Sequence, residues 1–168
     1  MADIVKIIVE MQPKSKFIGK KYTDKDRNEF NSFSNQWQEW FANGYFKELE
    51  KLEGMESMSD DYIGFCKLTE TGFEYWIGCF MGLDDETPEG YEDMIVEGGK
   101  VGVCYIYGKE DTGELYGIEP HNKCLEALKE KNYKIKDPCA FERYNCPRFT
   151  TPDEKGNVIL DYCFFLED

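Results

Sequence analysis

The sequence is poor in basic residues. Of its 168 residues, 20 are Lys or Arg and 34 are Asp or Glu, so the formal net charge is −14 at pH 7. A chain that binds nucleic acid needs a basic face to neutralise phosphates, and anionic lipid likewise attracts basic segments. We therefore expect neither a nucleic-acid partner nor docking on a membrane surface.

Long hydrophobic runs are also absent. The early apolar stretch from Ile4 to Val9 is short and is interrupted by Lys6, which is too little for a signal peptide or a membrane span. We expect a soluble, cytoplasmic protein. The hydrophobic content of 41% and the aromatic content of 15% can fill a core at this length, so a single domain over residues 1–168 is expected.

The usual signatures of metal, nucleotide and serine-hydrolase sites are missing. Seven cysteines are scattered without a CxxC pair, and His121 is the only imidazole, which excludes zinc sites of the usual spacings. Gly98-Gly99 fits neither a GxGxxG nor a P-loop pattern, and no GxSxG motif is present. We expect no cofactor and no metal, with buried free thiols favoured over a Cys139–Cys146 disulfide. His121 is expected to be an exposed residue of a first helical turn.

Periodicity and turn residues predict two halves with the same order of elements. In the first half, strands are expected at 3–11, 17–22, 62–68 and 73–81, with a polar loop at 54–61. A long helix is expected to begin at Thr23 or Asp24 and to break near Asn43-Gly44. In the second half, strands are expected at 91–96, 100–107, 141–145 and 158–166, with a helix from Pro120 to Asn132.

The expected fold class is therefore α+β. Duplicated strand-helix-strand-strand halves, about 1–84 and 90–168, form an antiparallel sheet with two main helices on one face and a ligand cleft on the other. Several strands are aromatic or apolar on both faces, so the second face would stay uncovered unless a ligand fills it. Exposed aromatic surface of this kind usually marks a binding site.

Strand alternation places Glu142 and Tyr144 on the same face of their strand. Taken alone, this pattern is more typical of a solvated carboxylate at a strand edge than of a site. Glu74 fits a surface position as well as a pocket wall. The helical spacing of Trp37 and Trp40 favours a packing role over ligand contact.

Three stretches of the sequence carry a family resemblance. They are residues 72–78 (GFEYWIG), 97–108 (EGGKVGVCYIYG) and 141–144 (FERY). In order and spacing, across nearly the whole chain, they resemble the GyrI-like, or AraC effector-binding, superfamily of small-molecule-binding domains. The resemblance implies a ligand cleft between the halves, where an acidic residue faces an aromatic pocket for cationic or planar apolar compounds. Glu142 is the residue that matches this acidic position.

On this basis we expect a domain that senses or sequesters a cationic or polycyclic aromatic ligand, as in multidrug-binding members linked to transcription regulation. The chain begins with a strand and has no basic helical segment, so we expect no DNA binding by the chain itself. The expected ligand-binding residues are Glu142, Tyr144, Tyr75, Trp76, Tyr105, Tyr107, Tyr162, Phe164 and Trp40.

The resemblance leaves alternatives open. Some members hydrolyse strained electrophilic rings in genotoxic natural products. Glu142 would then act as a general base on water, and Tyr75, Tyr105 or Tyr144 would hold or protonate the leaving oxygen. Other members bind DNA gyrase, which would imply a protein partner for the acidic surface. A haem-binding relative also exists, for which His121 would be the only available imidazole ligand.

Overall fold

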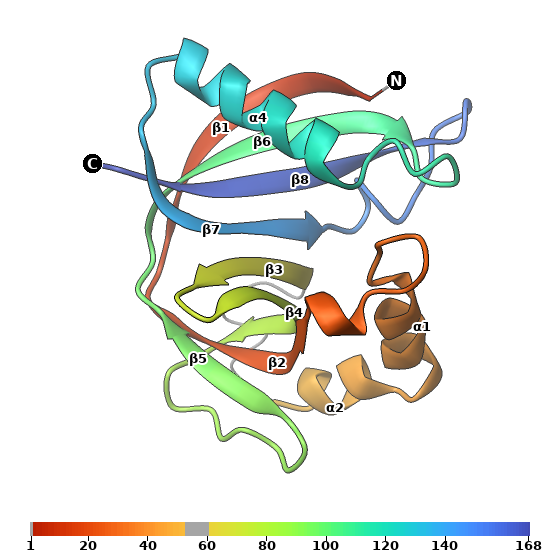
Figure 1. The fold of residues 1–168 in the computed structure, drawn as a ribbon, viewed down its shortest axis with the longest axis vertical. Coiled ribbons are helices and arrows are strands. Elements are labelled where there is room, and N and C mark those ends of the chain that lie inside the picture. Colours follow the sequence, from red (N-terminus) through yellow and green to blue (C-terminus); the bar gives the residue numbers. More distant parts are fainter. Residues whose placement is uncertain (1, 53–60) are drawn as a thin grey trace. The chain divides into compact units, whose positions relative to one another are not determined.

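The computed structural model describes residues 2–52 and 61–168, so residues 54–60 of the expected polar loop lie outside the described part. It divides into two compact units (Figure 1). We call residues 14–97 the N-terminal unit, and residues 1–13 together with 98–168 the C-terminal unit. The expected first half begins at residue 1, whereas the structure groups the first strand with the C-terminal unit.

The described residues of the N-terminal unit, 14–52 and 61–97, contain four antiparallel strands and two short α-helices. Its strands are β2 (Ser15–Thr23), β3 (Tyr62–Thr69), β4 (Gly72–Met81) and β5 (Glu92–Val96), and its helices are α1 (Ser34–Ala42) and α2 (Tyr45–Glu50). β4 pairs with both β2 and β3, and β2 also pairs with β5. The predicted hairpin between β3 and β4 is confirmed, and Gly72 adopts there a φ of 128° that favours glycine.

The C-terminal unit contains four antiparallel strands and one longer helix. Its elements are β1 (Asp3–Gln12), β6 (Gly99–Lys109), α4 (Ile118–Glu130), β7 (Ile135–Tyr144) and β8 (Asn157–Leu166). β8 pairs with β6 and β7, and β6 also pairs with β1. As predicted, α4 ends near Asn132, which has a φ of 67°, a left-handed conformation common after helix ends.

The two units share one topology. In each, a strand leads into helix and then into a hairpin, and the last strand lies between the other two: β4 between β2 and β3, and β8 between β6 and β7. The predicted α+β class with duplicated strand-helix-strand-strand halves is therefore confirmed. No helix within residues 2–52 and 61–168 is long and apolar enough to cross a membrane.

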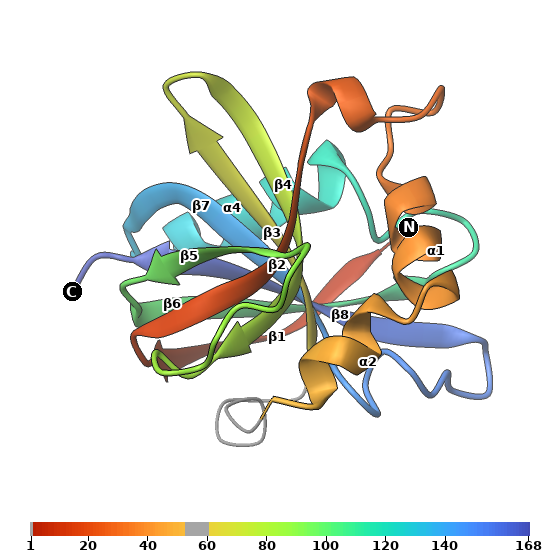
Figure 2. The same cartoon turned by 90° about the horizontal axis from the view of Figure 1, so that it is seen from below.

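The first long helix begins later than predicted. A single 3-10 turn (Asp24–Asp26) follows β2, and α1 starts only at Ser34. Between them the side-chain oxygen of Asn28 accepts hydrogen bonds from the backbone amides of Phe30 and Ser32. Such side-chain contacts compete with helix formation. The predicted break is confirmed, since Gly44 has a φ of 68° and α2 follows at an angle to α1 (Figure 2).

Each unit buries a core beneath its helices. In the N-terminal unit, α1 and α2 place Trp40, Phe46 and Leu49 in one cluster with Ile18 and Ile77 of the sheet. In the C-terminal unit, α4 places Cys124 and Leu128 against side chains of β6 and β8. All seven cysteines are free thiols, and four of them are buried, which confirms the preference for free thiols over a disulfide.

The expectation of an uncovered second face is wrong. The rings on the face of β2, β3 and β4 away from the helices are between 0% and 5% exposed: Phe17, Phe65, Trp76 and Phe80. The centroid of the Phe17 ring lies 5.5, 6.1 and 5.3 Å from those of Phe65, Trp76 and Phe80, respectively. On the corresponding face of the C-terminal unit, Phe141 and Phe165 are also buried. Within the N-terminal unit Phe17 packs against the other three rings, and within the C-terminal unit Phe141 packs against Phe165 at 5.8 Å, so these rings are core and do not form the exposed surface that was expected.

Candidate functional site

Glu142 and Tyr144 form a hydrogen-bonded pair near the end of β7. The Tyr144 hydroxyl donates to Oε2 of Glu142, as side chains two residues apart on one strand face can do. Both side chains are half-buried. In the β7–β8 register Glu142 lies opposite Tyr162, which belongs to the core cluster beneath α4. The pair therefore lies on the helix face of its unit, whereas a ligand cleft was expected on the other face.

Aromatic side chains from three segments lie near this carboxylate. Tyr162 of β8 is buried, and its hydroxyl donates to the Leu115 carbonyl at 2.7 Å. That bond holds the loop before α4 next to β8. The residue after Leu115, Tyr116, is close enough to Glu142 for the carboxylate charge to raise its pKa. Phe149, from the loop after β7, packs edge-on against Tyr144 at 4.8 Å. We call Glu142, Tyr144, Tyr116, Phe149 and Tyr162 the Glu142 cluster.

The electrostatics of the Glu142 cluster favour positive charge. Partial burial raises the pKa of Tyr116 above its usual range, and the negative charges of Glu110 and Glu142 raise it further. The tyrosine therefore stays neutral and contributes only its ring face and hydroxyl. A half-buried carboxylate beside aromatic rings can bind a cation, accept a hydrogen bond from a ligand, or take a proton from water.

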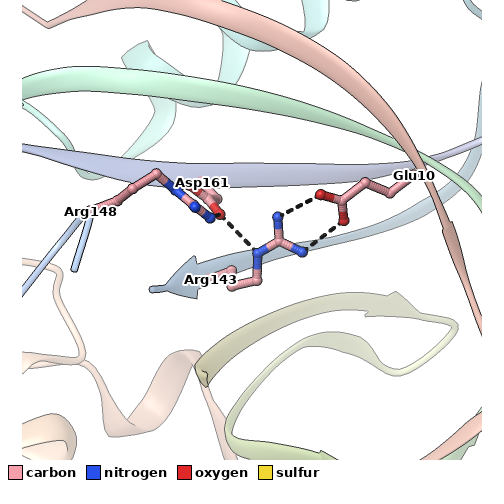
Figure 3. A network of polar contacts seen from close by, with 4 residues as sticks. All are labelled: Glu10, Arg143, Arg148 and Asp161. Atoms are coloured by element: carbon pink, nitrogen blue, oxygen red, sulfur yellow. Dashed lines mark hydrogen bonds and ion pairs between the residues drawn. The ribbon is translucent and has the colours of Figure 1, made fainter. Parts of the chain in front are cut away.

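The opposite face of the same strands carries a network of four charged side chains (Figure 3). Nε of Arg143 donates to Asp161 at 2.8 Å, and its two terminal nitrogens donate to the Glu10 carboxylate at 3.0 and 3.2 Å. Arg148 binds the same Asp161 with two nitrogens, at 3.2 and 2.6 Å. Asp161 is fully buried. Through Glu10, Asp161 and Arg143 this network links β1, β7 and β8. Its two positive and two negative charges cancel, which makes it a poor ligand site.

Tyr105 and Tyr107 lie on that network face, away from the Glu142 cluster. Tyr105 pairs with Asp161 in the β6–β8 register, and the Arg148 guanidinium lies 4.6 Å from its ring. Partial burial raises the pKa of Tyr105, while Arg148 opposes the shift. The Tyr107 hydroxyl donates to Asp153 in the loop before β8. Within the C-terminal unit, these two tyrosines therefore do not join Glu142 in one group.

Two other predicted residues of the C-terminal unit are nearly inaccessible. Tyr162 and Phe164 are only 3% and 2% exposed, because α4 and its preceding loop cover them. The Phe164 ring contacts His121 edge-on at 5.1 Å. The expectation that His121 is an exposed helix-start residue is therefore wrong: it is half-buried, and burial lowers the pKa of its imidazole.

The three predicted residues of the N-terminal unit are core side chains with internal hydrogen bonds. Tyr75 stacks on Phe33 at 4.5 Å, and its hydroxyl accepts from Nε1 of Trp37 at 3.0 Å. Trp76 points to the opposite face and donates to Glu74 at 3.1 Å. Trp40 is fully buried, which confirms its predicted packing role.

Two members of the Glu142 cluster, Tyr116 and Phe149, were not predicted. Both lie in loops, where neither the period of a helix nor that of a strand indicates which way a side chain points. The one available signal was that each is the single aromatic residue of its loop, residues 110–117 and 145–156. Among residues 2–52 and 61–168, no group of three or more His, Cys, Asp or Glu side chains could hold a metal ion.

Searches by sequence gave no match to a family model or to a curated protein. Solved structures do match. A candidate bacterial transcription regulation protein from Staphylococcus aureus MU50 aligns over 97% of this chain and 99% of its own, with 13% identity and a TM-score of 0.69. SAV2435, solved with bound tetraphenylphosphonium, aligns over 97% of this chain and 94% of its own, with 14% identity and a TM-score of 0.70.

A third match is EcmrR in a complex with DNA, with 11% identity and a TM-score of 0.62. This chain is covered over 97% of its length, but the match spans only 57% of EcmrR. At such identities the likeness establishes a shared fold and nothing more. The fold of this chain is therefore one that occurs in a ligand-bound protein and in a DNA-bound one.

Proposed function

We propose that this protein binds small aromatic cations at the Glu142 cluster. The observation that carries the proposal is the half-buried Glu142 carboxylate, hydrogen-bonded to Tyr144 and placed opposite Tyr162. A carboxylate that is partly removed from water attracts a cation more strongly than one in bulk water, because the local dielectric constant is lower. The neighbouring ring faces add attraction for a cation, by about 0.5–2 kcal/mol each depending on desolvation.

The cluster suits a large, weakly hydrated cation better than a metal ion or a small amine. Besides the carboxylate it offers mainly phenol and phenyl groups, which provide apolar contact area and few ligating oxygens. A lipophilic cation loses little hydration on entering such surroundings. The overall charge of −14 also raises the local concentration of cations and speeds their association.

Two further observations support this assignment. The fold-related SAV2435 was solved with tetraphenylphosphonium, a cation carrying four phenyl rings. The resemblance of three stretches to the GyrI-like, or AraC effector-binding, superfamily also implies that Glu142 corresponds to that family's ligand-facing acid. We therefore propose a ligand-sensing or sequestering role of the kind found in transcription regulators.

The direct test is to titrate the protein with tetraphenylphosphonium by calorimetry and by thermal shift. We expect saturable binding and a rise in melting temperature, because a ligand that binds only the native state stabilises it. Glu142→Gln keeps the shape and removes the charge. We expect it to weaken binding about 10-fold, equivalent to about 1.4 kcal/mol.

Glu74→Gln is the matched control. Glu74 also accepts a hydrogen bond from an aromatic side chain two residues later, Trp76, but it lies in the other unit. We expect this control to leave the affinity unchanged. Equal loss in the two variants would refute a specific role for Glu142, and absence of saturable binding by the wild-type protein would refute the proposed function.

Hydrolysis is the second candidate function. A fold-related chain is a hydrolase encoded by lin2189 from Listeria innocua, matched with 11% identity and a TM-score of 0.53. In this reading Glu142 takes a proton from water, the water oxygen attacks an electrophilic ring carbon, and Tyr144 protonates the departing group. Incubation with a cyclopropane-bearing alkylator would yield a ring-opened product with the wild-type protein but not with Glu142→Gln. Equal product from both proteins, or none from either, would exclude this route.

A further inference from the structure

The side chain of Lys20 lies between two tyrosine rings of the N-terminal unit. Its Nζ is 4.3 Å from the centroid of Tyr45 and 4.9 Å from that of Tyr91, both within the range of a cation–π contact. The same nitrogen donates to the Gly90 carbonyl at 3.0 Å at the surface. The Lys20 side chain, which extends from β2, is thus held by three groups: one from the start of α2 and two from the loop between β4 and β5.

The ring of Trp40 contacts both tyrosine rings. The Trp40 ring meets Tyr45 and Tyr91 edge-on, at 5.4 and 5.9 Å, and the two tyrosines lie 6.3 Å apart. Hydrogen bonds fix these rings, because Tyr91 donates to the Tyr45 carbonyl at 2.7 Å and Trp40 donates to the Tyr22 hydroxyl at 3.0 Å. We call Trp40, Tyr45 and Tyr91 the aromatic cage.

Two carboxylates, those of Glu39 and Glu48, lie near the aromatic cage. Burial raises the pKa of Tyr91 to about 12, with the charge of Glu48 adding to the shift. The Tyr45 hydroxyl also donates to Glu39 at 3.3 Å. Tyr91 therefore stays neutral at physiological pH, and the two nearby carboxylates favour whichever cation occupies the cage.

We propose that the aromatic cage is a second cation-binding site, specific for quaternary ammonium head groups, in which Lys20 is an internal occupant that the ligand displaces. A primary ammonium is strongly hydrated and needs hydrogen-bond partners for its three donors. A quaternary ammonium has no donors and is the cation that aromatic cages recognise best. The Lys20 head group lies at the surface end of the cage, so it can leave without disturbing the core.

The quaternary ammonium can belong to a free metabolite of the choline type or to a trimethylated lysine in a peptide. The two sources share one head group and differ in what is attached to it. Parallel titrations with choline and with a short trimethyllysine peptide separate them, and tighter binding of either one identifies the source.

The test uses tetramethylammonium chloride as the probe, with sodium chloride holding the ionic strength constant. Binding is followed by NMR, through the upfield ring-current shift of the probe methyl protons and the shift of the Trp40 indole N–H. We expect Lys20→Ala to bind the probe about 10-fold more tightly than the wild-type protein, because the internal competitor is gone. Lys21→Ala removes an exposed lysine from the next position and should bind like the wild-type protein.

Two further variants keep the test decisive. If Lys20→Ala unfolds, Lys20→Thr is used in its place, because a β-branched side chain suits a strand. Adding Tyr91→Leu to either Lys20 variant should remove the gain, whereas Glu142→Gln should leave it unchanged. The inference is overturned if neither Lys20 variant binds the probe more tightly than Lys21→Ala, or if the gain survives Tyr91→Leu.

Discussion

The two units of this protein share a topology but fill it with different chemistry. On both faces of its sheet the N-terminal unit is packed with rings, such as Phe17 on one face and Trp40 on the other. The C-terminal unit packs aliphatic, thiol and aromatic side chains under α4, and it buries a charged network on its second face. One arrangement of strands can therefore be stabilised by aromatic packing or, in part, by compensated charge.

A short motif shows the same contrast. In each unit a glutamate accepts a hydrogen bond from an aromatic residue two positions later: Glu74 from Trp76, and Glu142 from Tyr144. Glu74 lies on β4, which pairs with β2 on one side and β3 on the other, and it points to the face away from the helices. Glu142 lies on β7, a flanking strand, on the helix face. Similar sequence at topologically different positions thus produces a core contact in one unit and a candidate site in the other.

The largest effect is expected from breaking the aromatic core of the N-terminal unit. Trp40→Ala removes a fully buried ring that contacts Tyr45, Phe46 and Tyr91. We expect the free energy of unfolding to fall by about 4 kcal/mol, from lost burial and the cavity left behind. Urea denaturation measures it. Phe30→Ala, at a ring that is 80% exposed, should cost under about 1 kcal/mol, and similar losses for both would contradict the difference in burial.

A somewhat smaller effect is expected from breaking the charged network of the C-terminal unit. Asp161→Asn leaves the guanidinium groups of Arg143 and Arg148 facing an amide in place of a carboxylate. Removal of one partner from a buried ion pair costs about 3 kcal/mol or more. Chemical denaturation of this variant beside Asp111→Asn, which changes an exposed carboxylate, tests the expectation. A loss below about 1 kcal/mol would mean that the network contributes no more than a surface ion pair.

The smallest effect concerns acid sensitivity of the C-terminal unit. Burial against Phe164 lowers the pKa of His121 in the folded state. As pH falls below about 6.5, the unfolded chain takes up a proton at this residue before the folded chain does, so stability decreases. We expect His121→Gln to reduce the loss of stability between about pH 7 and pH 5. Identical pH profiles for the two proteins would show that the imidazole titrates as it does in water.

Much of the fold follows from local sequence rules. Alternation, turn glycines and Asn132 predict the strands, the β3–β4 hairpin and the end of α4. The start of α1 was missed, because the Asn28 side chain binds backbone amides and holds an extended loop. The burial of the second sheet face was missed as well, because composition alone does not show that rings such as Phe17 and Trp76 interlock.

The candidate site could be predicted only where one strand supplies it. Alternation pairs Glu142 with Tyr144, and the hydrogen bond between them confirms that they share a face. Contacts between segments that are far apart in the sequence leave no periodic pattern. Tyr116, for example, belongs to the Glu142 cluster but lies in the loop before α4. In the same way, Glu10 pairs with Arg143 across 133 positions of sequence. The alternation of a strand divides its side chains between two faces, but it does not tell which face of one strand continues into which face of the next. Tyr105 and Tyr107 were therefore grouped with Glu142, although they lie on the opposite face.

The charge of Glu142 is the feature on which the proposed function depends, and cation selectivity measures it most directly. Tetraphenylphosphonium and neutral triphenylphosphine oxide present similar rings, so calorimetric dissociation constants of both for the wild-type protein and Glu142→Gln separate charge from shape. We expect the substitution to weaken binding of the phosphonium about 10-fold and to leave that of the oxide unchanged. Equal effects on the two compounds, or no effect on either, would contradict the account.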